Sequence, residues 1–238
     1  MTAWRLPVAA AIVLSCAQAS AQGLPDGFVH LSGVAPGIVQ DIRYSGALNF
    51  LGRPAAGYDA AECILTKQAA AALAKVQAGL EAEGLTLVVF DCYRPMAAVD
   101  DFVGWARQGG PADPRWHPKV ERGDLVREGY IGANSSHARG STVDVAIASK
   151  AGNTATDPDC GATAQAMLDF GTGFDCFDER SRTAYAPLAG EAAANRRLLV
   201  ERMKQAGFRN YSREWWHFTL TDEPFPKTQF DFPVTAGP

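Results

Sequence analysis

Three groups that can bind a metal ion lie far apart in this chain, and any fold that uses them must bring them together. The segment 135–144 reads S-S-H-A-R-G-S-T-V-D and supplies His137 and Asp144, and His217 ends a second motif, E-W-W-H. Two imidazoles and one carboxylate are three protein ligands, which leave the fourth position of a tetrahedral zinc ion open for water. Glu214, which opens the second motif, could accept a proton from that water. The pattern indicates metal-assisted hydrolysis.

The local sequence indicates how His137, Asp144 and His217 could come close together. Serines and Gly140 flank His137 and disfavour regular structure, so we expect a turn that lets Asp144, on the following strand, approach His137. The W-W-H-F-T run favours a strand, so Glu214 is expected in the turn before it. A single buried histidine is more often a satisfied core residue. From residue chemistry alone, the metal site and this structural reading stay equally open.

Composition limits the class of protein. The chain has 238 residues, 47% of them apolar, which is enough for one sizeable core. A net charge of -4 gives no support for a nucleic-acid partner. No repeat, linker or second apolar stretch long enough for a membrane anchor is visible after the first 21 residues, so we expect a single domain over residues 22–238. The sequence does not indicate an oligomeric state.

Residues 1–21 have the pattern of a secretory signal peptide. Arg5 precedes an apolar run over 6–14 that is too short to span a membrane, and A-S-A offers a cleavage site after Ala21. Two alternatives remain: a lipoprotein signal, in which V-L-S would lead to a lipid-modified Cys16, and a plain N-terminal helix. We expect a secreted or periplasmic protein.

The cysteines are consistent with export. Cleavage would leave Cys63, Cys92, Cys160 and Cys176, and four cysteines in an oxidising compartment indicate two disulfides with three possible connectivities. We favour Cys160–Cys176, which closes a short Gly-rich segment, and Cys63–Cys92, which ties a helix start to a strand end. The alternatives are a four-thiolate zinc site, for which C-x-x-C spacing is lacking, and free buried thiols.

The order of expected elements predicts an α+β fold. Helices are predicted over 67–83, with Thr66 as the N-cap, and over 95–107 and 191–205. Strands are predicted over 85–90, 142–148 and 215–220. We therefore expect a small antiparallel sheet that carries the metal site and is flanked by helices, rather than a doubly wound α/β fold.

The two motifs, S-x-H-x-x-G-x-x-x-D and E-x-x-H, resemble those of the lysostaphin/D-Ala-D-Ala metallopeptidase/hedgehog superfamily of zinc proteins. Within it, the chain resembles the D-alanyl-D-alanine dipeptidases of the VanX type. The matching stretches cover nearly all of the chain after residue 21 and include D-I-R-Y at 41–44, Y-R-P at 93–95, F-D at 174–175 and F-D-F-P-V at 230–234. The short zinc motifs specify only the superfamily, whereas the aromatic-rich flanks and the C-terminal ending point to the dipeptidase branch.

The resemblance implies one zinc ion per chain, bound by His137, Asp144 and His217 in a fold like that of the hedgehog proteins and D-Ala-D-Ala peptidases. It implies Glu214 as the base that activates the water and then protonates the leaving amine. Arg94 would stabilise the oxyanion that forms as the peptide carbonyl is attacked.

The resemblance also implies a substrate pocket. Asp175 corresponds to the carboxylate that receives the free ammonium of the substrate, while Ser136, Tyr44 and Tyr58 match other pocket positions. A buried carboxylate that pairs with the ammonium would reject peptides with a blocked N-terminus.

The expected function is therefore zinc-dependent hydrolysis of D-alanyl-D-alanine in the cell envelope, in scavenging or wall turnover rather than antibiotic resistance. One alternative is a D,D-carboxypeptidase or endopeptidase acting on peptidoglycan stem peptides, which would have an extended cleft and no ammonium-binding Asp175. The other is a zinc-bearing binding module without activity, which would have lost Glu214. The segment 150–173 is longer than expected for these dipeptidases and could reshape the edge of the pocket.

Overall fold

The computed structural model describes Met1 and residues 23–152 and 158–237. The predicted signal peptide, its cleavage site after Ala21 and the alternative lipidation site at Cys16 lie outside the described residues, Met1 apart. Within the described part of the chain, no helix combines the length and the apolar character needed to cross a membrane.

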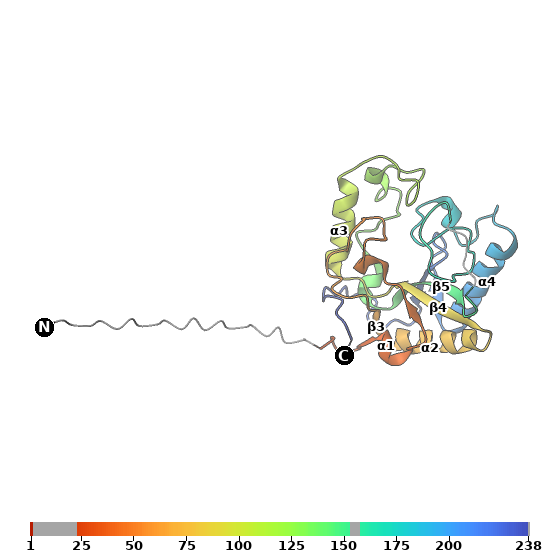
Figure 1. The fold of residues 1–238 in the computed structure, drawn as a ribbon, viewed down its shortest axis with the longest axis horizontal. Coiled ribbons are helices and arrows are strands. Elements are labelled where there is room, and N and C mark those ends of the chain that lie inside the picture. The colour runs from red at the N-terminus through yellow and green to blue at the C-terminus, as the bar shows by residue number, and fades with distance from the viewer. Residues whose placement is uncertain (2–22, 153–157, 238) are drawn as a thin grey trace.

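A five-stranded sheet forms the centre of the fold, with β4 in yellow and β5 in green in Figure 1. The strand order is β2-β4-β5-β7-β6. These strands span Val39–Gln40 (β2), Leu85–Asp91 (β4), Thr142–Ser149 (β5), Phe208–Asn210 (β6) and His217–Leu220 (β7). β2 runs parallel to β4, and the remaining pairings are antiparallel. A second, two-stranded antiparallel sheet joins β1 (Phe28–His30) to β3 (Ile64–Thr66).

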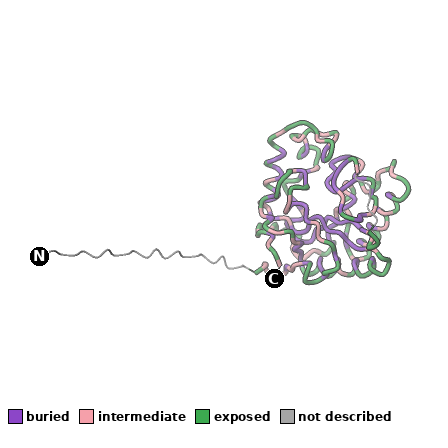
Figure 2. The backbone as a smooth tube through the Cα atoms, in the orientation of Figure 1, coloured by how far each residue is buried: buried purple, intermediate pink, exposed green. Residues whose placement is uncertain are grey.

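Helices cover the sheet. The α-helices are α1 (Leu31–Val34), α2 (Lys67–Glu81), α3 (Met96–Arg107) and α4 (Gly190–Gln205), and the short 3-10 helices are η1 (Arg43–Ser45), η2 (Arg122–Asp124), η3 (Ser136–Arg139) and η4 (Glu179–Ser181). α2 and α4 pack against the sheet and contact each other, whereas α3 lies apart from both, at the upper left of Figure 1. The buried backbone concentrates in the sheet between these helices (Figure 2).

The α+β class predicted from the sequence is confirmed, and most predicted elements end within a few residues of the observed ones. Thr66 caps α2 as expected, because its hydroxyl accepts a hydrogen bond from the N–H of Ala69 at 3.3 Å. Two details differ. The sheet is mixed rather than wholly antiparallel because the short strand β2 pairs in parallel with β4, and the strand predicted from Trp215 begins at His217.

Both favoured disulfides are present. Cys63 is bonded to Cys92 and Cys160 to Cys176. The alternatives of a four-thiolate zinc site and of free thiols at these positions are therefore wrong.

The C-terminal segment runs back along the molecule and covers η3. The N–H of Phe230 donates to the carbonyl of Ala138 at 2.9 Å, and the ring of Phe232 stacks on Tyr93 with centroids 4.0 Å apart. The N–H of Val234 donates to the carbonyl of Gly57 at 2.8 Å. The end of the chain is thus packed against residues that adjoin both Arg94 and His137.

Candidate metal centre

The centre is built at one end of three neighbouring strands. Asp91 of β4 lies opposite Asp144 of β5, and Asp144 lies opposite His217 of β7. Residues directly opposite each other in a sheet share a face, so these three side chains gather on one side. The β4–β5 register shifts between Val89 and Asp91, which leaves Phe90 as an extra residue in β4. Such a bulge re-aims the residues that follow it, and here it places Asp91 beside Asp144.

His137 reaches the same point from η3, through a turn that the sequence predicted. Gly140 ends η3 with φ = 76°, in the left-handed region that favours glycine. A Cβ atom at this position would lie 2.2 Å from Cε1 of Phe28, so only glycine fits the turn. The chain can therefore pass from His137 into β5 and present Asp144 four residues after the turn.

The structure brings the three predicted ligands together. His137, Asp144 and His217 each offer one ligand atom, and these atoms lie within 4.8 Å of one another. Nε2 of His137 is 3.3 Å from Oδ2 of Asp144 and 3.3 Å from Nδ1 of His217. Nδ1 of His217 is 3.2 Å from Oδ1 of Asp144. This arrangement is the size of a site for one metal ion.

The surrounding hydrogen bonds fit a metal ion. Nδ1 of His137 lies 2.7 Å from the carbonyl oxygen of Cys92, which can only accept, so in the neutral ring Nε2 presents its lone pair to the cluster. Nε2 of His217 lies 3.2 Å from the hydroxyl of Ser136, which can accept its proton and leave the lone pair of Nδ1 facing the cluster. The buried Oδ1 of Asp144 accepts no hydrogen bond from the described residues. The lone pairs of these histidine nitrogens and of the Asp144 oxygen therefore face one another with no hydrogen-bond donor between them. A divalent cation at that point would stabilise this arrangement.

Glu214 lies in the turn before β7, as expected, with Oε2 3.5 Å from Nδ1 of His217. Burial raises the pKa of this carboxyl to about 7, and the charge of Asp144 acts in the same direction. A carboxyl with a pKa near neutrality is suited both to accept a proton and to return it.

Arg94 is held by a residue that the sequence reasoning missed. The fully buried Asp91 accepts hydrogen bonds through Oδ2 from Nε of Arg94 at 2.9 Å and through Oδ1 from the hydroxyl of Tyr58 at 2.5 Å. Nη2 of Arg94 is 2.8 Å from Asp91 and 3.8 Å from Asp144. The only signal in the sequence was an acidic residue at the end of a buried strand, three positions before Arg94.

A cavity of about 350 Å³ opens beside the cluster. The predicted residues Tyr44, Arg94, Ser136, Asp175 and Glu214 line it together with the three cluster residues. Lining residues that were not predicted include Tyr130, Asn134, Tyr211 and Trp216. Tyr58 stands behind this wall, bonded to Asp91, and is absent from the lining.

Asp175 is a further acidic residue that lines the cavity, and it is buried. It is a non-glycine residue with φ = 59°, and Oδ2 accepts a hydrogen bond from the hydroxyl of Tyr44 at 2.8 Å. Burial raises the pKa of the Asp175 carboxyl well above its usual range, and the charge of Asp144 adds to the effect. A cationic group in the cavity would favour its ionised form.

Comparison with known proteins identifies the family. Residues 25–235 match the peptidase M15 family, described as D-Ala-D-Ala dipeptidase. The chain belongs to this family. It is 38% identical to the D-alanyl-D-alanine dipeptidase of Enterococcus faecalis over 216 residues, which cover 89% of this chain and 100% of that protein. It is 36% identical to the D-alanyl-D-alanine dipeptidase of Streptomyces coelicolor, in a match that covers 87% of this chain and 98% of that protein. It is 35% identical to the D-alanyl-D-alanine dipeptidase of Escherichia coli, in a match that covers 88% of this chain and 94% of that protein.

Membership of the peptidase M15 family makes the chain a metal-dependent peptidase, as the two motifs predicted. The match begins after the predicted signal peptide and includes both motifs, the disulfide-linked segment before Asp175 and the C-terminal segment. The resemblance drawn from the motifs is thereby confirmed.

The buried Asp91–Arg94 pair generates a stability prediction. Asp91→Asn leaves the Arg94 guanidinium without its main counter-charge, so we expect a loss of about 3 kcal/mol of unfolding free energy. Urea unfolding with a metal chelator present measures the loss. Asp101→Asn is the matched control, because Asp101 pairs with the exposed Arg53 and such surface pairs contribute about 0–1 kcal/mol. Equal losses in the two variants would contradict the role given to Asp91.

Proposed function

We propose that this family member is a zinc-dependent dipeptidase that hydrolyses D-alanyl-D-alanine to two molecules of D-alanine. The observation that carries the proposal is that one cavity holds both the His137–Asp144–His217 cluster and a buried carboxyl group, that of Asp175, which forms no ion pair with any of the described residues. The names of the relatives support this substrate.

We propose His137, Asp144 and His217 as the ligands of the zinc ion, since two imidazoles, a carboxylate and water are a donor set that zinc prefers. A zinc ion held there would supply a Lewis acid that polarises the peptide carbonyl and lowers the pKa of a water molecule. The Cys92 carbonyl and the Ser136 hydroxyl keep the two imidazoles turned toward the ion.

The remaining steps are assigned to the protein. Glu214 accepts a proton from the attacking water as the water oxygen bonds to the carbonyl carbon. Arg94, fixed by Asp91 at the cavity wall, stabilises the negative charge that develops on the carbonyl oxygen. The carbon–nitrogen bond then breaks, and Glu214 returns the proton to the leaving amine.

Selectivity for a dipeptide is assigned to Asp175 and Tyr44. A free α-ammonium would pair with the Asp175 carboxylate, whose orientation is set by the Tyr44 hydroxyl at 2.8 Å. A peptide with an acylated N-terminus brings no charge and leaves the buried carboxylate unmatched, so binding is weakened.

Export is part of the proposal. Cys63, Cys92, Cys160 and Cys176 are all in disulfides, which persist in oxidising compartments. Together with the N-terminal pattern, this supports a protein of the cell envelope that is cleaved after Ala21. N-terminal sequencing of the protein from a periplasmic or culture fraction should begin at Gln22. A lipid-modified N-terminus at Cys16, or an uncleaved chain in the cytoplasm, would contradict this location.

Two variants separate metal binding from proton transfer. Glu214→Ala should keep the metal and lose about 100- to 10,000-fold in turnover, because the proton acceptor is gone. His137→Ala should lower the metal content itself, because a ligand is lost. Metal analysis of the purified proteins and a D-alanine assay distinguish the two effects. Full activity of the Glu214 variant, or unchanged metal content of the His137 variant, would remove that residue from its role.

The decisive experiment is release of D-alanine from three substrates: D-Ala-D-Ala, its N-acetyl derivative and a muropeptide that ends in D-Ala-D-Ala. We expect cleavage of the free dipeptide alone, abolished by a zinc chelator. Cleavage of the blocked or longer substrates would instead establish a D,D-carboxypeptidase or endopeptidase. Absence of all cleavage, with metal bound, would favour a non-hydrolytic binding module.

A further inference from the structure

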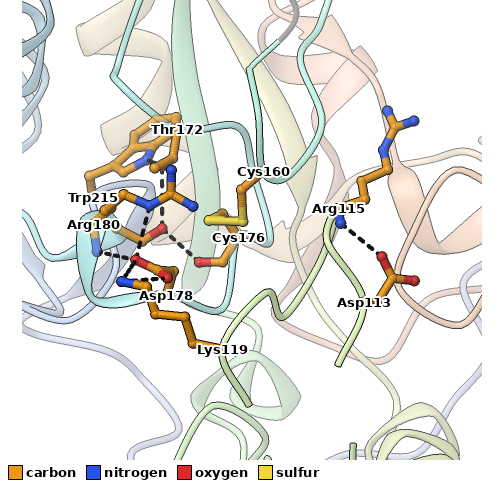
Figure 3. The surroundings of a disulfide bond; sticks show 10 residues. Asp113, Arg115, Lys119, Cys160, Thr172, Cys176, Asp178, Arg180 and Trp215 are labelled. Carbon is orange, nitrogen blue, oxygen red and sulfur yellow. Dashed lines mark hydrogen bonds and ion pairs between the residues drawn. A yellow bond between two sulfur atoms is a disulfide. The ribbon is translucent and has the colours of Figure 1, made fainter. Parts of the chain in front are cut away.

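A disulfide lies directly beside the proposed ammonium site. Cys176 follows Asp175 in the chain, and its bond to the buried Cys160, drawn in yellow in Figure 3, closes a loop that contains Asp175. The two sides of the loop are also paired through the backbone. The N–H of Gly173 donates to the carbonyl of Cys160 at 2.8 Å, and Ala162 and Phe174 exchange two hydrogen bonds of 2.9 and 2.8 Å.

The backbones of the two sides touch, with no room for side chains between them. A Cβ atom on Gly161 would lie 2.6 Å from the carbonyl carbon of Gly173, and one on Gly173 would lie 2.4 Å from the nitrogen of Ala162. One closely packed unit therefore ends at Asp175. It consists of the disulfide, the paired backbones and these two glycines.

Asp175 needs such support because its backbone is in the left-handed region, with φ = 59°. A non-glycine residue keeps this conformation only when the surrounding structure imposes it. On one side, the ring of Phe174 stacks on Phe90 with centroids 4.7 Å apart. On the other, the Cys176 carbonyl accepts hydrogen bonds from the Ser181 hydroxyl at 2.6 Å and from the N–H of Asp178 at 2.9 Å.

The loop, through Thr172, and the segment after it, through Ser181, are hydrogen-bonded to the turn that carries Glu214. Nε1 of Trp215 donates to the hydroxyl of Thr172 at 2.8 Å, and the N–H of Trp215 donates to the carbonyl of Ser181 at 3.0 Å. Figure 3 shows Thr172 and Trp215 beside the Cys160–Cys176 bond. Asp175 is thus positioned relative to Glu214 through contacts that do not include a metal ion.

We propose that the Cys160–Cys176 disulfide determines substrate specificity by holding Asp175 where it can pair with the α-ammonium of a free dipeptide. The proposal rests on the function proposed above. The disulfide does not touch the substrate and acts only through the position of Asp175. Its loss should weaken binding of the free dipeptide and leave the cluster and Glu214 in place.

The test is the double variant Cys160→Ala/Cys176→Ala, which leaves Cys63–Cys92 intact. We expect KM for D-Ala-D-Ala to rise about 10- to 100-fold, as a small misplacement of a binding group can cause, with little change in kcat or metal content. The preference for the free over the N-acetylated dipeptide should fall by a similar factor. In an Asp175→Asn background the same two substitutions should raise KM no further, because the group they position is already lost.

Gly52→Ala is the control for general destabilisation. Gly52 has φ = 69° with open space around it, so an alanine there strains the backbone without touching Asp175. It should lower the melting temperature and leave KM unchanged. If the double variant does not fold, the disulfide of the wild-type protein is reduced with a phosphine instead. The phosphine is oxidised as the disulfide becomes two thiols. Peptide mapping then identifies which disulfide has been opened. Dissociation constants measured by calorimetry on Glu214→Gln protein give a second readout.

The results distinguish a failure of this inference from a failure of the proposed function. A wild-type protein that cleaves D-Ala-D-Ala, with unchanged KM and unchanged preference after loss of Cys160–Cys176, would overturn this inference and leave the proposed function intact. A further rise of KM in the Asp175→Asn background would also overturn it, because the disulfide would then act elsewhere. A wild-type protein that neither binds nor cleaves the dipeptide would overturn the proposed function, and this inference with it.

Discussion

The register of β4, β5 and β7 is the constraint on which the rest of the site depends. Asp91, Asp144 and His217 stand opposite one another across these strands and share one face. A slip of one residue in either pairing would turn Asp144 to the opposite face and remove it from the cluster. The bulge at Phe90 belongs to the same constraint, because without it Phe90 would take the place opposite Asp144.

The charges of the cavity explain why such a site would take two cations. Asp144, Glu214 and Asp175 line it, while the charge of Arg94 is largely engaged by the buried Asp91 behind the wall. Arg139, the other basic lining residue, is paired with Glu223 at 2.8 Å. The cavity therefore has an excess of acidic groups, and a metal ion at one end and an ammonium at the other would each favour their ionised forms.

The sequence was sufficient to select the residues of the cluster, because residue type and local order reveal them. His137, Asp144, Glu214 and His217 lie in two short motifs, and the Gly140 turn could be anticipated because it involves neighbours in the chain. Asp91 could not, since its role depends on a bulge in β4 and on the pairing of β4 with β5. The hydrogen bond between His137 and the carbonyl of Cys92 could not be predicted either, because the pattern of residue types does not report backbone contacts. The parallel pairing of β2 with β4 was missed because a strand of two residues shows no pattern that indicates its neighbour in the sheet.

The C-terminal segment is synthesised after the other parts of the site. Its hydrogen bond to Ala138 and its stacking on Tyr93 brace the residues next to His137 and Arg94, and His217 itself lies near the end of the chain. Proteins are synthesised from the N-terminus, and their domains fold as units once the chain is available. A nascent chain therefore already carries His137 and Asp144 while His217 and the bracing segment are still missing. The three-residue cluster can therefore be completed only once the chain has been synthesised beyond His217.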